Sequence, residues 1–195
     1  MKMKHLASLP LLAALLTPLC LAQAPVFVIT PADSTIKFNV KASVEIAGTF
    51  DKWDATLVFT SPEVSTGVLD IKIQAASVNT GSGMKNDKLK GKDFFDAEQD
   101  PVISFKSTKI VQTGPTTFDV QGTFTIRGVS KPETLNLTVS GVGTGTGAIK
   151  GTMAFDRKEF GMNSGIPFIK IADRVEVDVD LVGKRVSGPP LNIKK

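Results

Sequence analysis

The side chains that most often carry catalysis are scarce in this chain of 195 residues. Its one Cys (Cys20) and its one His (His5) both lie within the first 22 residues. If that segment is removed on export, as argued below, the remaining chain has no thiol and no imidazole. It then has no Cys or His nucleophile, no disulfide and no thiolate or imidazole zinc ligand. No nucleophile-elbow or phosphate-loop spacing is present either, so we expect a protein that is not an enzyme.

Four basic side chains are candidates for contacting an anionic group of a ligand. Lys85, Lys88 and Lys92 are spaced i, i+3 and i+7, which places them on one face of a short helix. Arg157 precedes Phe160 by three residues and could turn inward to pair with a carboxylate or a ligand oxygen. The alternatives are a solvated lysine face and a surface ion pair of Arg157.

A small acidic group, Asp93, Asp96 and Glu98, is the remaining arrangement with possible chemistry. Its spacing matches no EF-hand-like calcium loop, so no metal site is expected.

Alternation of apolar and polar residues dominates the rest of the sequence and predicts strands with one dry and one wet face. Every even position from Thr35 to Ile46 is apolar, and every odd position from Val175 to Leu181 is apolar. Similar segments bring the total to about eight strands, separated by Gly, Pro, Asn, Asp and Ser. The fold class is therefore all-β, a sandwich or a barrel, and closing a barrel removes the exposed edges. An outer-membrane barrel also alternates, but this chain has no Tyr for an aromatic girdle.

The first 22 residues read as a cleaved secretory signal, with Lys2 and Lys4 before an apolar run that ends in small residues. Cleavage after Ala22 is expected; lipid attachment at Cys20 is the alternative. Residues 23–183 then form one domain, and residues 184–195 form a basic, flexible tail. The net charge falls from +4 to +2 without Lys2 and Lys4, which gives no reason to expect a nucleic-acid partner. The expected location is the periplasm or the outside of a bacterial cell, with no stable membrane span.

Two segments interrupt the strands. Residues 83–97 predict a short helix that Thr80 or Ser82 could cap. Residues 127–132 (RGVSKP) predict a hairpin turn with a permissive backbone at Gly128 and pairing limited by Pro132.

Three stretches resemble the YceI-like family of exported lipid-binding proteins: residues 84–108 (MKNDKLKGKDFFDAEQDPVISFKST), 122–141 (GTFTIRGVSKPETLNLTVSG) and 155–183. The resemblance implies an extended, lipocalin-like antiparallel barrel with a short helix near its mouth. It also implies a polyisoprenoid-type amphiphile in the interior. The family often has His where this chain has Ala42 and Lys88, so any role of those imidazoles is not carried over.

Under this resemblance, apolar side chains that point inward are candidates for lining a lipid site, although each could equally be ordinary core. The candidates are Phe38, Val40, Phe50, Phe59, Leu69, Ile71, Ile73, Phe94, Phe95, Phe105, Phe124, Ile126, Leu137 and Phe155. The expected function is binding of an isoprenoid or quinone-like lipid for carriage or storage in the cell envelope, with no other cofactor and with a homodimer possible. The alternative is an exported interaction module with a filled core that binds protein or surface partners through its loops.

Overall fold

The computed structural model describes residues 23–43, 46–165 and 168–194, and the predicted secretory signal (residues 1–22) lies outside these ranges. One α-helix, four short 3₁₀ turns and eleven strands are described. They are β1 (Val26–Ile29), η1 (Pro31–Asp33), β2 (Thr35–Ala42), β3 (Ile46–Phe50), β4 (Trp53–Val58), η2 (Val64–Thr66), β5 (Val68–Gln74), η3 (Ala75–Ser77), β6 (Val78–Asn79), α1 (Gly83–Lys90), β7 (Val102–Gln112), β8 (Thr117–Ile126), β9 (Val129–Val139), β10 (Thr146–Asp156), η4 (Arg157–Phe160) and β11 (Ile171–Ser187).

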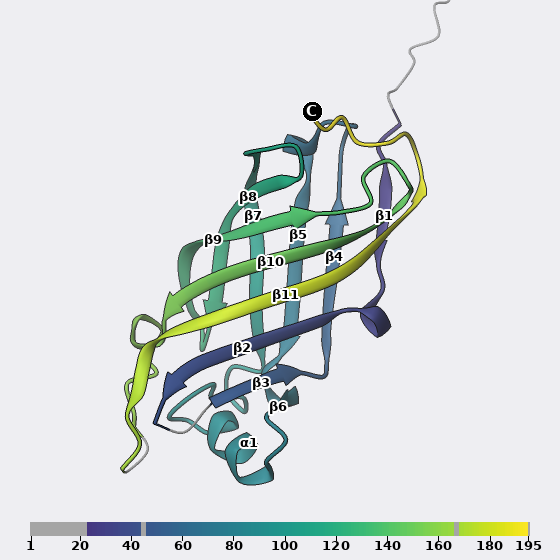
Figure 1. Ribbon diagram of the computed structural model, residues 1–195. Coiled ribbons are helices and arrows are strands. Elements are labelled where there is room, and N and C mark those ends of the chain that lie inside the picture. Colours follow the sequence, from purple (N-terminus) through teal and green to yellow (C-terminus); the bar gives the residue numbers. More distant parts are fainter. Residues whose placement is uncertain (1–22, 44–45, 166–167, 195) are drawn as a thin grey trace, which may run out of the picture.

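Eight of the strands form a closed antiparallel ring in the order β1-β4-β5-β7-β8-β9-β10-β11, which closes where β11 pairs with β1. The predicted all-β, lipocalin-like barrel is therefore confirmed. The long strand β11 pairs with β1 near its end and with β2 over its first two thirds. From β2, the strands β3 and β6 extend the wall toward α1, which lies at one end of the barrel (Figure 1).

The alternation in the sequence decides which face of each strand is buried. In β2, Ile36, Phe38 and Val40 are buried while the residues between them are exposed. The alternating run predicted one strand as far as Ile46, but β2 ends at Ala42 and Ile46 begins β3. A period of two cannot show this break, because the pattern resumes in phase on the next strand.

The hairpin predicted between residues 127 and 132 joins β8 to β9. Arg127 and Gly128 both have positive φ, 54° and 68°, between the paired residues Ile126 and Val129. Two consecutive left-handed residues make a type I′ turn, whose twist matches that of the strands. Pro132 lies in the half of β9 that pairs with β8 alone, since β10 pairs with β9 only beyond it. Among the described residues, no strand pairs with Pro132 on its other side, so its missing N–H leaves no acceptor of a neighbouring strand without a donor. A strand tolerates proline at such a position.

The helix is shorter than predicted, because α1 ends at Lys90 and residues up to Gln99 continue as turns. Ser82 occupies the N-cap position but its side chain makes no capping hydrogen bond. Instead, Oδ1 of Asn86 accepts hydrogen bonds from the backbone N–H of Thr80 (2.8 Å) and from its hydroxyl (2.7 Å). Within the described ranges, no helix combines the length and apolar character needed to cross a bilayer.

The C-terminal segment differs from the flexible tail that the sequence predicted for residues 184–195. Lys184–Ser187 complete β11, because β1 needs these residues as its partner. Further on, the backbone N–H of Asn192 donates to the carbonyl of Pro62 at 2.8 Å. Gln112 exchanges two hydrogen bonds with the backbone of Lys194, at 2.7 and 3.0 Å. The segment is thus held against the end of the barrel opposite α1 (Figure 1).

Candidate functional site

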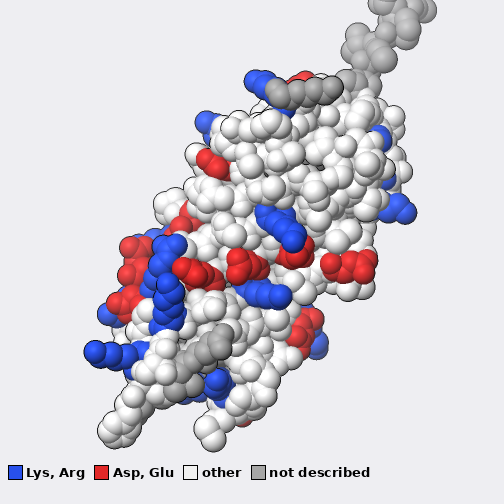
Figure 2. Space-filling view, viewed as in Figure 1, with Lys and Arg blue, Asp and Glu red and all other residues white. Residues whose placement is uncertain are grey.

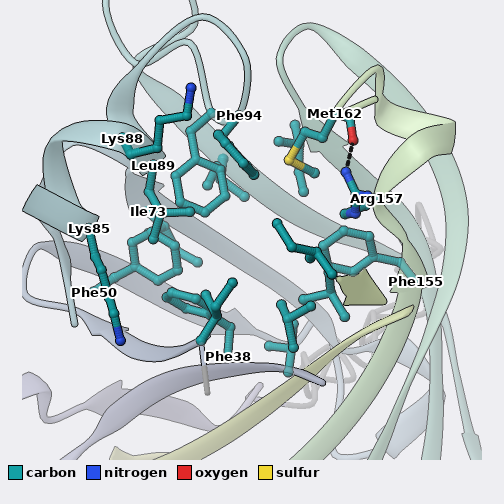
Figure 3. Close-up of a pocket in the computed structure, with 18 of the residues that line it drawn as sticks. Phe38, Phe50, Ile73, Lys85, Lys88, Leu89, Phe94, Phe155, Arg157 and Met162 are labelled. Atoms are coloured by element: carbon teal, nitrogen blue, oxygen red, sulfur yellow. Dashed lines mark hydrogen bonds between the residues drawn. The ribbon is translucent and has the colours of Figure 1, made fainter. Parts of the chain in front are cut away.

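A cavity of about 140 Å³ lies inside the barrel at the end that carries α1, and we call it the helix-end cavity (Figure 3). Strands β2, β3, β5, β7, β8, β10 and β11 contribute apolar side chains, and α1 with the turns after it covers the end. The apolar lining residues are Ile36, Phe38, Val40, Ile46, Phe50, Ile73, Leu89, Phe94, Phe95, Ile103, Phe124, Ile126, Phe155, Met162, Ile169, Ile171, Val175 and Val177.

Two groups of three phenylalanines stiffen this cavity. Phe38, Phe50 and Phe95 have ring centroids 5.6 to 6.3 Å apart. A second trio, Phe124, Phe155 and the fully buried Phe160, has centroids 5.1 to 5.6 Å apart. In Figure 3, Phe50 and Phe155 lie on opposite sides of the cavity. Tilted and edge-on ring pairs of this kind are the favourable aromatic geometries, and they leave flat ring faces for an apolar ligand.

The three lysines predicted to face a head group are separated by the structure. Lys85 and Lys88 line the helix-end cavity, with their ammonium groups pointing away from its centre (Figure 3). Nζ of Lys88 is 2.7 Å from Oδ2 of Asp93 and 5.7 Å from the ring centroid of Phe94. Lys92 is not among the lining residues; its carbonyl accepts a hydrogen bond from Nη2 of Arg127 at 3.0 Å. The helix ends before Lys92, so the i+7 position no longer continues the face.

Arg157 is buried and lines the same cavity. Its Nη1 donates to the carbonyls of Met162 and Ser164, the latter at 3.0 Å, and its Nε donates to the carbonyl of Ala172 at 3.2 Å. Its Nη2 contacts Oδ1 of Asp173 at 3.2 Å. Of the two orientations considered from the sequence, the structure shows the inward one with a carboxylate partner, and a surface ion pair does not describe this side chain. Its donors hold both ends of the loop between η4 and β11 against the cavity.

A second cavity, of about 170 Å³, lies at the opposite end of the barrel, and we call it the tail-end cavity. Together, the two cavities divide the apolar residues predicted from the sequence into three sets: residues that line one cavity, residues that line the other, and residues that line neither. Phe38, Val40, Phe50, Ile73, Phe94, Phe95, Phe124, Ile126 and Phe155 line the helix-end cavity. Phe59, Leu69 and Leu137 line the tail-end cavity, while Ile71 and Phe105 are buried and line neither.

About half of the apolar residues that line the helix-end cavity were not predicted from the sequence. The inward positions Val175 and Val177 of β11 were visible from their alternation but were not chosen as site residues. Met162 and Ile169 lie on the loop after η4, where no periodic pattern marks an inward side chain. Among the described residues, no group of three or more His, Cys, Asp and Glu is placed to hold a metal ion.

Acidic and basic side chains are interspersed on the outer wall, as Figure 2 shows across the middle of the face formed by β10, β11 and β2. One exposed pair, Lys150 and Asp180, lies 3.8 Å apart on β10 and β11. This face therefore has mixed charge and not the extended basic surface on which nucleic acids bind.

Two carboxylates near the cavity make the fold sensitive to acid. A hydrogen bond from Lys88 lowers the pKa of Asp93 below its ordinary 3.8. A hydrogen bond from Lys158 (2.8 Å), assisted by Arg157, does the same to the pKa of Asp173. Because folding lowers both pKa values, their stabilisation is complete above the ordinary value and is lost as pH falls through the lowered values.

We expect the Tm to fall as the pH drops below about 4, and to fall less in Asp173→Asn, which has no carboxylate to protonate there. Circular dichroism melts between about pH 2.5 and 7 measure both curves. Parallel curves for the wild type and the variant would contradict this assignment.

A closed barrel with an apolar, hollow interior and a polar outside places the protein in the class of small lipocalin-like barrels, whose interior can hold one small ligand. The match to known families is more particular. The model of the YceI-like domain matches residues 27–183, and the chain belongs to this family.

Relatives and solved structures agree with this assignment. A UPF0312 protein of Pseudomonas savastanoi pv. phaseolicola is 29% identical over 143 residues, covering 71% of this chain and 73% of the relative. Burkholderia cenocepacia BcnA is 29% identical with a TM-score of 0.72, covering 80% of this chain and 99% of that one. A polyisoprenoid binding domain from Saccharophagus degradans shares the fold at 16% identity, with a TM-score of 0.67 and coverage of 83% and 99%.

Proposed function

We propose that the protein binds a prenyl-type amphiphile without catalysing a reaction, with the hydrocarbon chain in the helix-end cavity. The observation that carries this proposal is the cavity itself: apart from Lys85, Lys88 and Arg157, every lining side chain is apolar. A filled core would not leave such a space, and so the cavity favours a ligand-binding role over a module that acts only through its loops. A protein of the same fold is a polyisoprenoid binding domain, which supports the choice of a prenyl chain.

Hydrocarbon burial is the expected source of affinity. Each buried CH₂ contributes about 0.8 kcal/mol, so one five-carbon unit contributes up to roughly 4 kcal/mol before ordering costs. An exposed ion pair contributes about 0 to 1 kcal/mol. A cavity of about 150 Å³ accepts benzene, so the helix-end cavity has room for about one prenyl unit without rearrangement. A longer chain then requires the two phenylalanine trios to move apart.

Filling the helix-end cavity tests the proposal. Val177 lines it on β11, and Val177→Trp would occupy the space that a prenyl unit needs. We expect at least a tenfold higher Kd for geranylgeraniol, measured by titration and by native mass spectrometry. Val186→Trp is the matched control, because Val186 is 54% exposed on the same strand and should leave the Kd unchanged. Equal affinities of the wild type and Val177→Trp would place the ligand elsewhere.

The lysines are proposed to select the head group and not to hold the ligand. We expect the Lys85→Gln, Lys88→Gln, Lys92→Gln triple variant to bind geranylgeraniol like the wild type. For geranylgeranyl phosphate we expect a Kd higher by about two- to fivefold, the effect of one exposed ion pair. An unchanged Kd for the phosphate would remove the head-group role.

We further propose a periplasmic or secreted location, on the basis of the pattern in residues 1–22. The mass of the protein recovered from a periplasmic fraction tests it. Cleavage after Ala22 gives one defined mass, whereas the mass of the uncleaved chain in the cytoplasmic fraction would contradict it.

A further inference from the structure

The two cavities are separated by a belt of buried side chains across the middle of the barrel. On each strand that contributes to both cavities, the inward residues that lie between the two linings belong to neither cavity. On β5, for example, Leu69 lines the tail-end cavity, Ile73 lines the helix-end cavity, and Ile71 between them lines neither. The belt consists of Ile71, Phe105, Val120, Leu135, Met153 and Val179, each at most 7% exposed.

Two of the belt side chains pack closely against glycines of neighbouring strands. Gly122 on β8 faces Phe105 on β7, and a Cβ added to Gly122 would lie 2.7 Å from Cζ of that ring. A Cβ added to Gly151 on β10 would similarly lie 3.1 Å from Cδ1 of Leu135. These two glycines let the large belt side chains pack over the neighbouring strand, β8 for Phe105 and β10 for Leu135. The two cavities share no lining residue among those described, and the buried belt side chains lie between them.

The tail-end cavity has its own cover. Pro190, Leu191 and Ile193 of the C-terminal segment line it, opposite Phe27 and Phe59, whose ring centroids are 5.7 Å apart. The cover is fastened on both sides of these residues. Asn192 bonds to the backbone of Pro62 and, through Nδ2, to Oε1 of Glu63 at 2.7 Å, while Lys194 exchanges its two hydrogen bonds with Gln112.

The lining of this cavity indicates an uncharged ligand. Arg185 is its one charged lining residue among those described, and Nη1 of Arg185 donates to the carbonyl of Gly188. The rest is apolar side chain, a hydroxyl at Ser140 and at Thr146, and the glycine-rich loop between β9 and β10. At about 170 Å³ the space is slightly larger than a cavity that accepts benzene.

We propose that the tail-end cavity is a second, separate binding site for an uncharged hydrocarbon chain or ring, closed by the C-terminal segment. The space present holds about six carbons, and a ten-carbon chain fits where the C-terminal segment shifts outward. This site goes beyond the proposed function, which concerns the helix-end cavity alone. The protein then holds two apolar ligands at once.

Counting bound geraniol, a ten-carbon prenyl alcohol, by native mass spectrometry and by calorimetry tests this site. We expect two equivalents on the wild type and on Val186→Trp. One equivalent should remain on Val139→Trp, which fills the tail-end cavity, and one on Val177→Trp, which fills the other. The double variant should bind none. Circular dichroism melts verify that each variant is folded.

The outcomes separate this inference from the proposed function. One equivalent on the wild type that Val177→Trp removes and Val139→Trp retains would overturn the second site and leave the proposed function intact. One equivalent that only Val139→Trp removes would overturn the proposed function and support the tail-end site.

A surface variant tests the cover without filling the core. Gln112→Ala removes both hydrogen bonds to Lys194. In the Val177→Trp background, where only the tail-end site remains, we expect geraniol to dissociate at least threefold faster. An unchanged rate would show that the C-terminal segment does not close the site.

Discussion

Phe105→Ala should lower the free energy of unfolding by about 3 to 5 kcal/mol, the usual cost of removing a buried aromatic ring. Phe105 is 4% exposed and its ring packs over Gly122 of the neighbouring strand, where glycine has no side chain to fill the space that the ring leaves. Urea denaturation monitored by circular dichroism measures the loss. Phe168→Ala is the control, because Phe168 is fully exposed and its removal should cost less than about 0.5 kcal/mol.

The same variant should change how many ligands bind. Opening the belt joins the two cavities, so one longer chain can occupy both where two short chains bound before. We expect Phe105→Ala to bind one equivalent of geranylgeraniol more tightly than the wild type does. Because the variant is less stable, binding is measured well below its Tm, where it is folded. If the variant is stable and still binds the C20 alcohol no better than the wild type, the belt is not what separates the two compartments.

Arg157→Met should lower the free energy of unfolding by about 2 to 4 kcal/mol. The substitution keeps most of the aliphatic stem but removes the donors to the carbonyls of Met162, Ser164 and Ala172 and the partner of Asp173. Buried acceptors that lose their donor cost more than the hydrogen bond contributed, because nothing replaces the water they gave up.

Two companion variants distinguish the causes. Arg157→Lys keeps the charge but lacks the planar guanidinium group with its several N–H donors, so it should recover only part of the lost stability. Arg174→Met removes an exposed arginine that pairs with Glu176 on the same strand, and it should change the stability by less than about 0.5 kcal/mol. If Arg157→Met and Arg174→Met lower the free energy of unfolding by the same amount, the buried hydrogen bonds of Arg157 do not contribute to stability.

The barrel was predictable because alternation fixes the buried face of nearly every strand. Lys37 and Asn39 are exposed and Phe38 is buried as the period of two requires, and the turn at Arg127 and Gly128 carries its own local signal. The division of the interior into two cavities was not predictable in this way. Phe105 and Phe124 are register partners on β7 and β8 with the same local pattern, yet Phe124 lines a cavity and Phe105 fills the belt. The difference depends on how far along the barrel axis each side chain lies. The alternation of apolar and polar residues indicates the face of a strand but not this position along the axis.

The polar part of the site was predicted less well for a related reason. The partners of Arg157 are mainly backbone carbonyls of a loop, and carbonyls carry no sequence signal. Lys92 was placed with Lys85 and Lys88 by helical spacing, but α1 ends at Lys90. Helix length is weakly determined when the segment is eight residues long and its contacts, not its propensity, hold it in place.

The strand β11 borders β10, β2 and β1 at once, and the partners on β2 and β1 lie roughly 130 to 160 residues earlier in the sequence. Such distant pairings are late and slow steps in folding, because a very long loop must close before they form. During synthesis the sheet therefore stays open along both edges until β11 has left the ribosome. A chain in this state has no closed barrel and therefore no enclosed cavity in which a ligand can be held.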